Sequence, residues 1–198
     1  MKNTAKLCAV TVVSLCLLCS CSKAPNNGTS QNYSVAQGTL ENVTATENEY
    51  VDYTFEYPGD WTIIRNDGMI AVQSSEEKVS DRVSISCTTF SVDPNLTVLE
   101  YWDGDGTEEK IGYYAKMKET IGGDFKEISR TELELGNTGA PALMVTYSAT
   151  TVDMTYQFSQ VVSIISGDVY TFTYTALPER FEEWKPAFTH AVASFKLK

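Results

Sequence analysis

The sequence has few of the residues on which enzyme active sites depend. It contains a single histidine, His190, among 198 residues. A Ser–His–Asp triad or a Cys–His pair requires a histidine beside its nucleophile, and the motifs G-x-S-x-G, P-loop and G-x-G-x-x-G are absent. His190 falls one position outside the apolar stripe of a predicted C-terminal helix, where we expect a partly exposed surface side chain. The sequence therefore argues against an enzyme and predicts no catalytic residue, bound cofactor or metal.

Basic residues are also scarce. The chain has 15 Lys and Arg but 26 Asp and Glu, which gives a formal net charge of −11. Binding to nucleic acid or to anionic lipid depends on clustered basic side chains that neutralise phosphate groups. The composition therefore argues against a nucleic-acid partner and favours a solvated acidic surface.

No apolar run is long enough to cross a membrane as a helix. The run Leu7–Leu18 has about a dozen residues, whereas a spanning helix needs ~20. Lys2 and Lys6 precede this run, and Ser20 and Cys21 follow it. This layout resembles a bacterial lipoprotein signal peptide with a lipobox. The resemblance implies cleavage before Cys21 and a diacylglycerol on the sulfur of that cysteine.

Two alternatives stay open for this segment. An ordinary signal peptide is disfavoured because no A-x-A-like cleavage site precedes the polar stretch. Lipidation at Cys19 would place Leu18 immediately before the cut, where lipoboxes favour a small residue. With Cys21 modified, two acyl chains anchor the protein stably. We therefore expect the chain at the cell membrane, lipid-anchored on the extracytoplasmic face.

Cysteines are absent from most of the chain. Four of the five lie in the leader or at its end, which leaves Cys87 as the only other thiol. Cys16-x-x-Cys19 has the spacing of a redox or zinc half-site, but it is removed with the leader. The mature chain then has no intramolecular disulfide and no cysteine metal site. Period-2 alternation places Cys87 on one face of a strand with Val83 and Ile85, so we expect a buried thiol.

The composition divides the chain into three parts. Residues 1–20 form the predicted signal peptide. Residues 21–46 begin with the lipidated cysteine and are rich in Ser, Asn, Thr, Gly and Gln, which is typical of a flexible tether. Residues 47–198 carry the periodic apolar patterns of a folded domain and are long enough to bury their own core.

The predicted domain contains both strands and helices. Period-2 alternation between turn residues favours eight strands, within residues 51–57, 61–65, 69–73, 82–90, 126–135, 142–150, 154–165 and 169–176. Helical spacing favours helices over 96–102, from a Thr107 cap to Ile121, and from Pro178 onward. Because Pro186 interrupts the last pattern, we expect a kink or a later start there.

Several stretches carry a family resemblance. Residues 55–61, FEYPGDW, resemble the F-x-Y-P-x-x-W opening of PsbP-like domains. The last strand and helix, 169–176 and 181–195, are similar to those of the same family, as is the turn at 139–142. The resemblance covers about residues 47–198. It implies an α+β fold, the Mog1/PsbP-like α-β-α sandwich, with a mostly antiparallel sheet and flanking helices.

The resemblance does not imply a photosystem function. PsbP proteins of oxygenic phototrophs help retain calcium and chloride at the manganese cluster, and no residue here matches a metal site of that family. The chain resembles more closely the PsbP-like lipoproteins of non-photosynthetic bacteria. Function inferred from fold alone is analogy.

Two short motifs are candidates for chemistry. The acidic turn Asp103–Glu109, with Asp103 and Asp105, is a candidate for a weak calcium site, but it lacks the Gly and Glu that an EF-hand loop requires. A turn ending in a helix cap is the favoured interpretation. Ser75-x-x-Lys78 has the spacing of a Ser/Lys nucleophile pair, but it lies in an acidic loop without the accompanying motifs.

The sequence leaves two candidate functions from different classes. The first is a non-catalytic interaction module that docks on an envelope complex through a protein partner. The second is a small-ligand or calcium-binding surface lipoprotein. A ligand groove requires a strand register that brings half-buried phenols to one face, and its candidates are Tyr147, Tyr156 and Tyr174.

Overall fold

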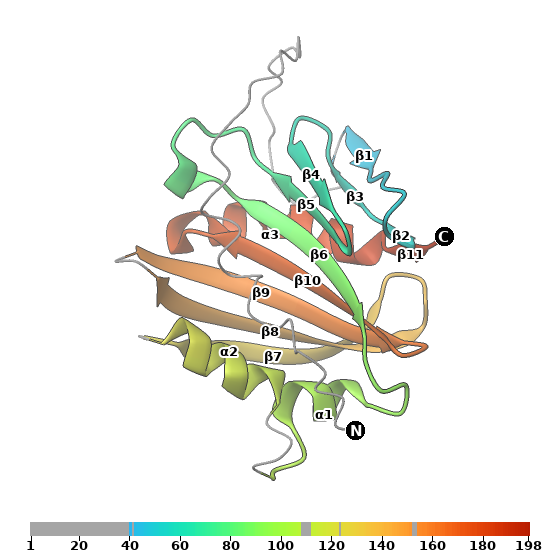
Figure 1. Ribbon diagram of the computed structural model, residues 1–198. Coiled ribbons are helices and arrows are strands. Elements are labelled where there is room, and N and C mark those ends of the chain that lie inside the picture. Colours follow the sequence, from blue (N-terminus) through green and yellow to red (C-terminus); the bar gives the residue numbers. More distant parts are fainter. Residues whose placement is uncertain (1–39, 41, 108–111, 123, 152–153) are drawn as a thin grey trace. The chain divides into compact units, whose positions relative to one another are not determined.

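The computed structural model describes residues 40, 42–107, 112–122, 124–151 and 154–198 (Figure 1). These residues belong to one compact unit, Gln31–Lys198. The predicted signal peptide and most of the predicted tether lie outside the described residues. None of the described helices has the length and apolar character that crossing a membrane requires.

A seven-stranded sheet forms the centre of the fold, and every neighbouring pair in it is antiparallel (Figure 1). The strand order is β4-β5-β6-β10-β9-β8-β7. Its strands are β4 (Thr62–Asn66), β5 (Met69–Gln73), β6 (Ser84–Ser91), β7 (Lys126–Leu135), β8 (Ala140–Thr151), β9 (Met154–Ile165) and β10 (Asp168–Ala176). All seven were predicted from alternation and turn residues, with small differences at their ends.

One face of the sheet is covered by the long C-terminal helix α3 (Pro178–Ala193). Its buried side chains Phe181, Trp184 and Phe188 pack in one apolar core with alternate sheet residues such as Phe172 and Cys87. The predicted buried thiol is confirmed, and burial raises the pKa of Cys87. The helix begins at Pro178, because the first residue of a helix needs no N–H for an intrahelical hydrogen bond. It continues through Pro186, so the predicted later start is wrong.

The opposite face packs against two short helices, α1 (Val98–Asp103) and α2 (Tyr113–Ile121). Trp102 from α1 and Met117 from α2 share a second core with Val145, Tyr147 and Phe158 of β8 and β9. Because side chains alternate between the faces of each strand, neighbouring residues of one strand enter different cores. The helices therefore flank the sheet on both sides, and the predicted α-β-α sandwich is confirmed.

The start of α2 differs from the prediction. Thr107 was expected to cap this helix, but α2 begins at Tyr113 with Gly112 as its N-cap. The Thr107 backbone N–H and hydroxyl both bind the Asp105 carboxylate, at 3.0 and 2.6 Å. This local turn competes with helix formation. The capping box of this region lies in α1 instead, between Thr97 and Glu100.

The N-terminal strand also differs from the prediction. Residues 51–57 form two short strands, β2 (Tyr53–Thr54) and β3 (Glu56–Pro58), neither of which joins the main sheet. β3 pairs with β1 (Val43–Ala45), and β2 pairs with β11 (Lys196–Leu197). Residues 43–46, which were assigned to the tether, therefore belong to the folded domain.

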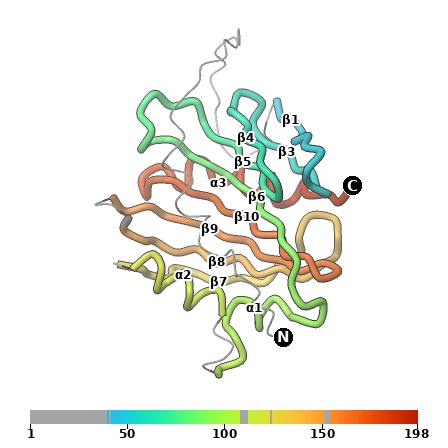
Figure 2. The backbone as a smooth tube through the Cα atoms, viewed as in Figure 1, coloured from blue at the N-terminus to red at the C-terminus, as the bar shows by residue number. Residues whose placement is uncertain are grey.

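The C-terminus returns to these early strands (Figure 2). The backbone N–H of Lys198 donates to the Asp52 carbonyl at 2.7 Å. The Lys198 ammonium donates to the carbonyls of Val51, at 2.9 Å, and of Asn48. These hydrogen bonds join Lys198 to the loop before β2.

Candidate functional site

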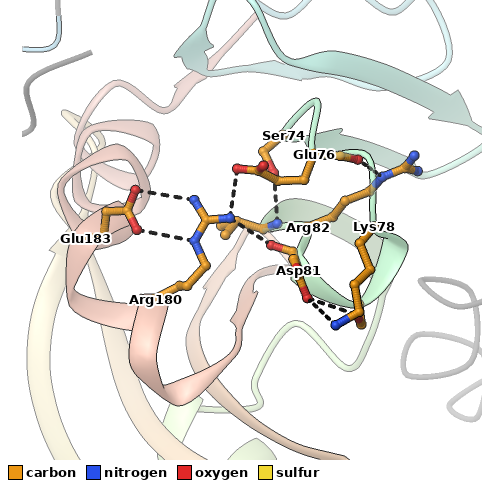
Figure 3. Close-up of polar contacts among 9 residues, drawn as sticks. Ser74, Glu76, Lys78, Asp81, Arg82, Arg180 and Glu183 are labelled. Carbon is orange, nitrogen blue, oxygen red and sulfur yellow. Dashed lines mark hydrogen bonds and ion pairs between the residues drawn. The ribbon is translucent and has the colours of Figure 1, made fainter. Parts of the chain in front are cut away.

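A charged cluster joins α3 to the loop between β5 and β6 (Figure 3). The Arg180 guanidinium donates to both carboxylate oxygens of Glu183 at 3.2 Å. Its Nη1 also reaches the Glu76 carboxylate at 2.7 Å and the Asp81 carbonyl at 3.0 Å. One arginine therefore binds three points, and two of them belong to a loop about 100 residues earlier in the chain.

The loop itself contributes further contacts. Arg82 Nε donates to the Glu76 carbonyl at 2.8 Å, and the Lys78 ammonium lies 3.2 Å from the Asp81 carboxylate. The short 3-10 helix η2 (Val79–Asp81) lies between them. A hydrogen bond from Ser80 lowers the pKa of Asp81, with smaller contributions from Lys78 and Arg180. The cluster joins this acidic loop to α3.

The contacts of Arg180 are with groups of the same chain. Hydrogen bonds to Glu183 raise the pKa of Arg180, and its guanidinium lies 5.9 Å from the Trp184 ring centroid. Each of its three nitrogen atoms therefore donates to at least one acceptor of the protein. The Ser75-x-x-Lys78 pair is not assembled, because the Ser75 hydroxyl donates to the Asp60 carbonyl at 3.0 Å while Lys78 pairs with Asp81.

The candidate calcium turn is also engaged by protein groups. Arg130 Nη1 binds both oxygens of the Asp103 carboxylate, at 2.9 and 2.8 Å, and Asp105 accepts the two bonds from Thr107. Arg130 also pairs with Glu127 at 3.2 Å. Within the described ranges, no group of three or more His, Cys, Asp or Glu residues is placed to hold a metal ion.

The three candidate tyrosines do not line one groove. Tyr147 and Tyr156 belong to the core beneath α1 and α2, whereas Tyr174 belongs to the core beneath α3. All three are buried. The Tyr174 hydroxyl donates to the Phe181 carbonyl at 2.6 Å. The prediction that these three tyrosines line one groove is therefore wrong, because the Tyr174 side chain lies on the opposite face of the sheet from Tyr147 and Tyr156.

His190 is partly exposed, as predicted, but it has a partner that the sequence did not indicate. Its Nε2 lies 2.8 Å from the Glu56 carboxylate of β3. The Glu56 backbone N–H donates to the Ser194 hydroxyl at 2.9 Å. No sequence signal links residues so far apart, and the pair joins α3 to β3.

The family is now decided by comparison. A family model described as PsbP-like protein matches residues 5–197. The chain belongs to the PsbP-like protein family. The F-x-Y-P-x-x-W residues of this PsbP-like protein anchor its core: Phe55 lies 5.2 Å from the Phe172 ring and Trp61 lies 5.3 Å from the Trp184 ring, between centroids. Cys21, the predicted lipidation site, lies outside the described residues.

Solved structures share the fold at low sequence identity. Cyanobacterial PsbP (CyanoP) from Synechocystis sp. PCC 6803 gives a TM-score of 0.56 at 16% identity, covering 84% of this chain and 98% of CyanoP. Mog1 gives 0.55 at 11% identity, covering 79% of this chain and 96% of Mog1.

LpqN, described as involved in cell envelope biogenesis of Mycobacterium tuberculosis, gives a TM-score of 0.52 at 14% identity, covering 79% of this chain and 90% of LpqN. No curated protein sequence matches the chain. At these identities, the similarity to the solved structures concerns the fold alone.

Proposed function

We propose that this PsbP-like protein is a lipoprotein held by Cys21 on the extracytoplasmic face of the cell membrane, and that its domain is a non-catalytic module docking on an envelope complex. The observation that carries the anchoring is the order of basic start, short apolar run and Ser20-Cys21. Two acyl chains on one cysteine suffice for stable attachment. The protein belongs, in this proposal, to the non-photosynthetic branch of the family.

The described charged groups support a role without chemistry. Arg180, Arg130 and His190 each pair with carboxylates of the same chain. Each pair joins elements distant in sequence, which is the pattern expected of a rigid scaffold. The fold that the protein shares with LpqN, a protein involved in cell envelope biogenesis, supports a place in the envelope.

Substitution of Cys21 and, separately, of Cys19 tests the anchor. We expect Cys21→Ser to abolish incorporation of labelled palmitate and leave an unprocessed or released protein, because the serine carries no thioether-linked diacylglycerol. The matched control, Cys19→Ser, changes the residue two positions earlier and should keep labelling, processing and membrane retention. Normal cleavage and membrane retention of Cys21→Ser would contradict the proposal, and loss of labelling only in Cys19→Ser would move the anchor to that residue.

Docking is tested separately, in intact cells that carry the lipidated wild-type protein. After cross-linking, we expect one discrete larger species on a denaturing gel, formed by the wild type and diminished when Cys21→Ser releases the protein from the membrane. A protein that stays on the membrane but runs as a monomer after cross-linking would contradict docking and leave the anchor intact.

A further inference from the structure

The turn before β2 presents an exposed aromatic ring. Tyr50 is 64% exposed, the highest value among the large apolar side chains of the described residues. Its backbone N–H donates to Asn48 Oδ1 at 3.0 Å, and the Asn48 side chain is buried. The Lys198 ammonium donates to the carbonyls of Asn48 and Val51, one on each side of Tyr50 in the chain. These hydrogen bonds connect the turn to the rest of the domain, and an ordered surface loses less conformational entropy when a partner binds.

A second apolar side chain belongs to the same corner of the domain. Leu197, which is 41% exposed, immediately precedes Lys198 and pairs with Tyr53 in the β2–β11 sheet (Figure 1). Tyrosine is enriched among the residues that dominate the binding energy of protein interfaces, and polar or charged groups commonly surround such residues. Residues 47–52 and 196–198, which we call the Tyr50 corner, therefore supply the apolar centre of a docking surface.

Two carboxylates beside Tyr50 are not neutralised within the domain. Glu47 and Glu49 are both exposed, and no ion pair among the described residues involves either of them. The cations at this turn bind backbone carbonyl groups instead. Arg65 Nε donates to the carbonyl of Glu47, and Lys198 binds the two carbonyls described above. The two carboxylates therefore remain available to the basic side chains of a partner.

Two exposed apolar side chains elsewhere in the domain differ in this respect. Beside Ile128, which is 51% exposed, the Glu127 carboxylate pairs with Arg130 at 3.2 Å. Beside Leu99, which is 50% exposed, the Glu100 carboxylate accepts the hydrogen bonds of the α1 capping box. Complementary charge determines much of the specificity and the association rate of protein complexes. A basic partner therefore gains more at the Tyr50 corner than at either of these two positions.

We propose that the Tyr50 corner is the docking surface for the envelope partner, and that this partner is a protein with an apolar pocket bordered by Lys or Arg side chains. The pocket takes the Tyr50 ring, with Leu197 at its border, and the basic side chains pair with Glu47 and Glu49. A lipid surface fits this corner less well, because exposed carboxylates are repelled by anionic headgroups. The inference rests on the docking role proposed above, and it names the surface and the chemistry of the partner.

Photo-cross-linking of the lipidated full chain in intact cells tests the surface. The probe is the photoreactive side chain of Tyr50→p-benzoylphenylalanine, which on irradiation bonds covalently to a C–H group within its reach. We expect one larger species that contains a partner protein, and the partner peptide attached at position 50 should carry Lys or Arg beside apolar residues. The matched controls place the same probe at Leu99 and at Ile128, which are half exposed. Neither control should form this species.

Charge reversal tests the chemistry of the partner. Glu47→Lys combined with Glu49→Lys should lower the yield of the chemically cross-linked species about tenfold, because repulsion replaces two ion pairs with the partner. The matched control combines Glu132→Lys with Glu134→Lys, at two exposed glutamates of β7 with the same spacing. It changes the net charge equally and should keep the yield of the wild type. Because all four side chains are exposed, both double variants should also keep the unfolding midpoint.

Several outcomes would overturn the proposal. An adduct at position 50 with phospholipid, with a second copy of the chain, or with a peptide that lacks basic residues would reject the stated partner. Equal yields from the two charge-reversed proteins would reject the role of Glu47 and Glu49. Adducts at Leu99 or Ile128 but not at position 50 would keep the docking role and move its surface. The absence of any larger species, in the wild type as well as in the variants, would reject the docking role itself.

Discussion

At the scale of the residue, the Arg180 side chain connects helix α3 to the loop between β5 and β6. It binds Glu183 on its own helix and Glu76 in the loop between β5 and β6, and its guanidinium lies over the Trp184 ring. Arginine suits this role because its planar fork presents several donors at once. The contact with Glu76 depends on the tertiary fold, because the two residues lie 104 positions apart in the chain.

We expect Arg180→Ala to lower the free energy of unfolding by about 1–2 kcal/mol, because an arginine with several hydrogen bonds contributes more than a single surface pair. Limited proteolysis should also cleave faster within residues 75–82. The matched control is Lys185→Ala on the same helix, since the Lys185 ammonium pairs with Glu182 at an exposed position. Its effect should stay within about 0.5 kcal/mol, and equal effects of the two variants in urea unfolding would contradict this account.

At the scale of the element, the turn between β7 and β8 contains two glycines in the left-handed region. Gly136 has φ of 54° and Gly139 has φ of 69°. A Cβ on Gly136 would lie 2.3 Å from the Phe195 carbonyl oxygen, whereas a Cβ on Gly139 would meet nothing within 4 Å. Both positions therefore require a residue that adopts a positive φ, and Gly136 must in addition lack a Cβ because the Phe195 backbone lies against it.

We expect Gly136→Ala to destabilise the protein by about 2–4 kcal/mol, because left-handed strain and a clash with rigid backbone add together. Gly139→Ala carries the strain alone and should cost about 1 kcal/mol. Thermal and urea unfolding of the two variants measure the difference. If Gly139→Ala proved as destabilising as Gly136→Ala, the packing of the turn against Phe195 would be refuted.

Helices and strands were predicted correctly where residues close together in the sequence specify them. The β4–β5 hairpin followed from Asn66-Asp67-Gly68 between two alternating runs and is present in the structure. The predicted start of α2 was wrong because the Asp105 turn competes with a Thr107 cap. The prediction of one strand over residues 51–57 was also wrong, since this segment forms β2 and β3. Alternation indicates which side chains are buried, but it does not indicate which strand each segment pairs with.

At the scale of the whole molecule, the two cores hold several buried or partly buried phenols. Burial raises the pKa of each of these tyrosines, and for Tyr170 a hydrogen bond to Asp52 adds to the effect. The tyrosines concerned are Tyr53, Tyr101, Tyr147, Tyr170 and Tyr174. The folded protein therefore keeps these side chains neutral at a pH where the unfolded chain ionises them.

This difference predicts alkaline unfolding. Unfolded tyrosines lose their protons near pH 10, so above that pH the folded state binds more protons than the unfolded state. The tyrosine contribution is fully present below pH 10, and above it the free energy of unfolding falls by about 1.4 kcal/mol per pH unit for each protected tyrosine. Absorbance at 295 nm and far-ultraviolet circular dichroism should change together in one cooperative step.

Tyr147→Phe provides the control for this prediction. Removing one protected phenol should make the fall of unfolding free energy with pH shallower by about 1.4 kcal/mol per pH unit. Gradual ionisation of all tyrosines while the dichroism stays native would contradict the burial of these phenols.

The sequence by itself determined the class of this molecule: its acidic composition, its buried thiol at Cys87, its strand-rich domain and its PsbP-like core motif. These features depend on composition and on contacts between near neighbours, which periodicity and turn residues report. Only the tertiary structure decided that Tyr174 lies on the other side of the sheet from Tyr147 and that His190 lies beside Glu56. Strand order and register bring together residues far apart in the chain, and a one-dimensional pattern carries no record of those pairings.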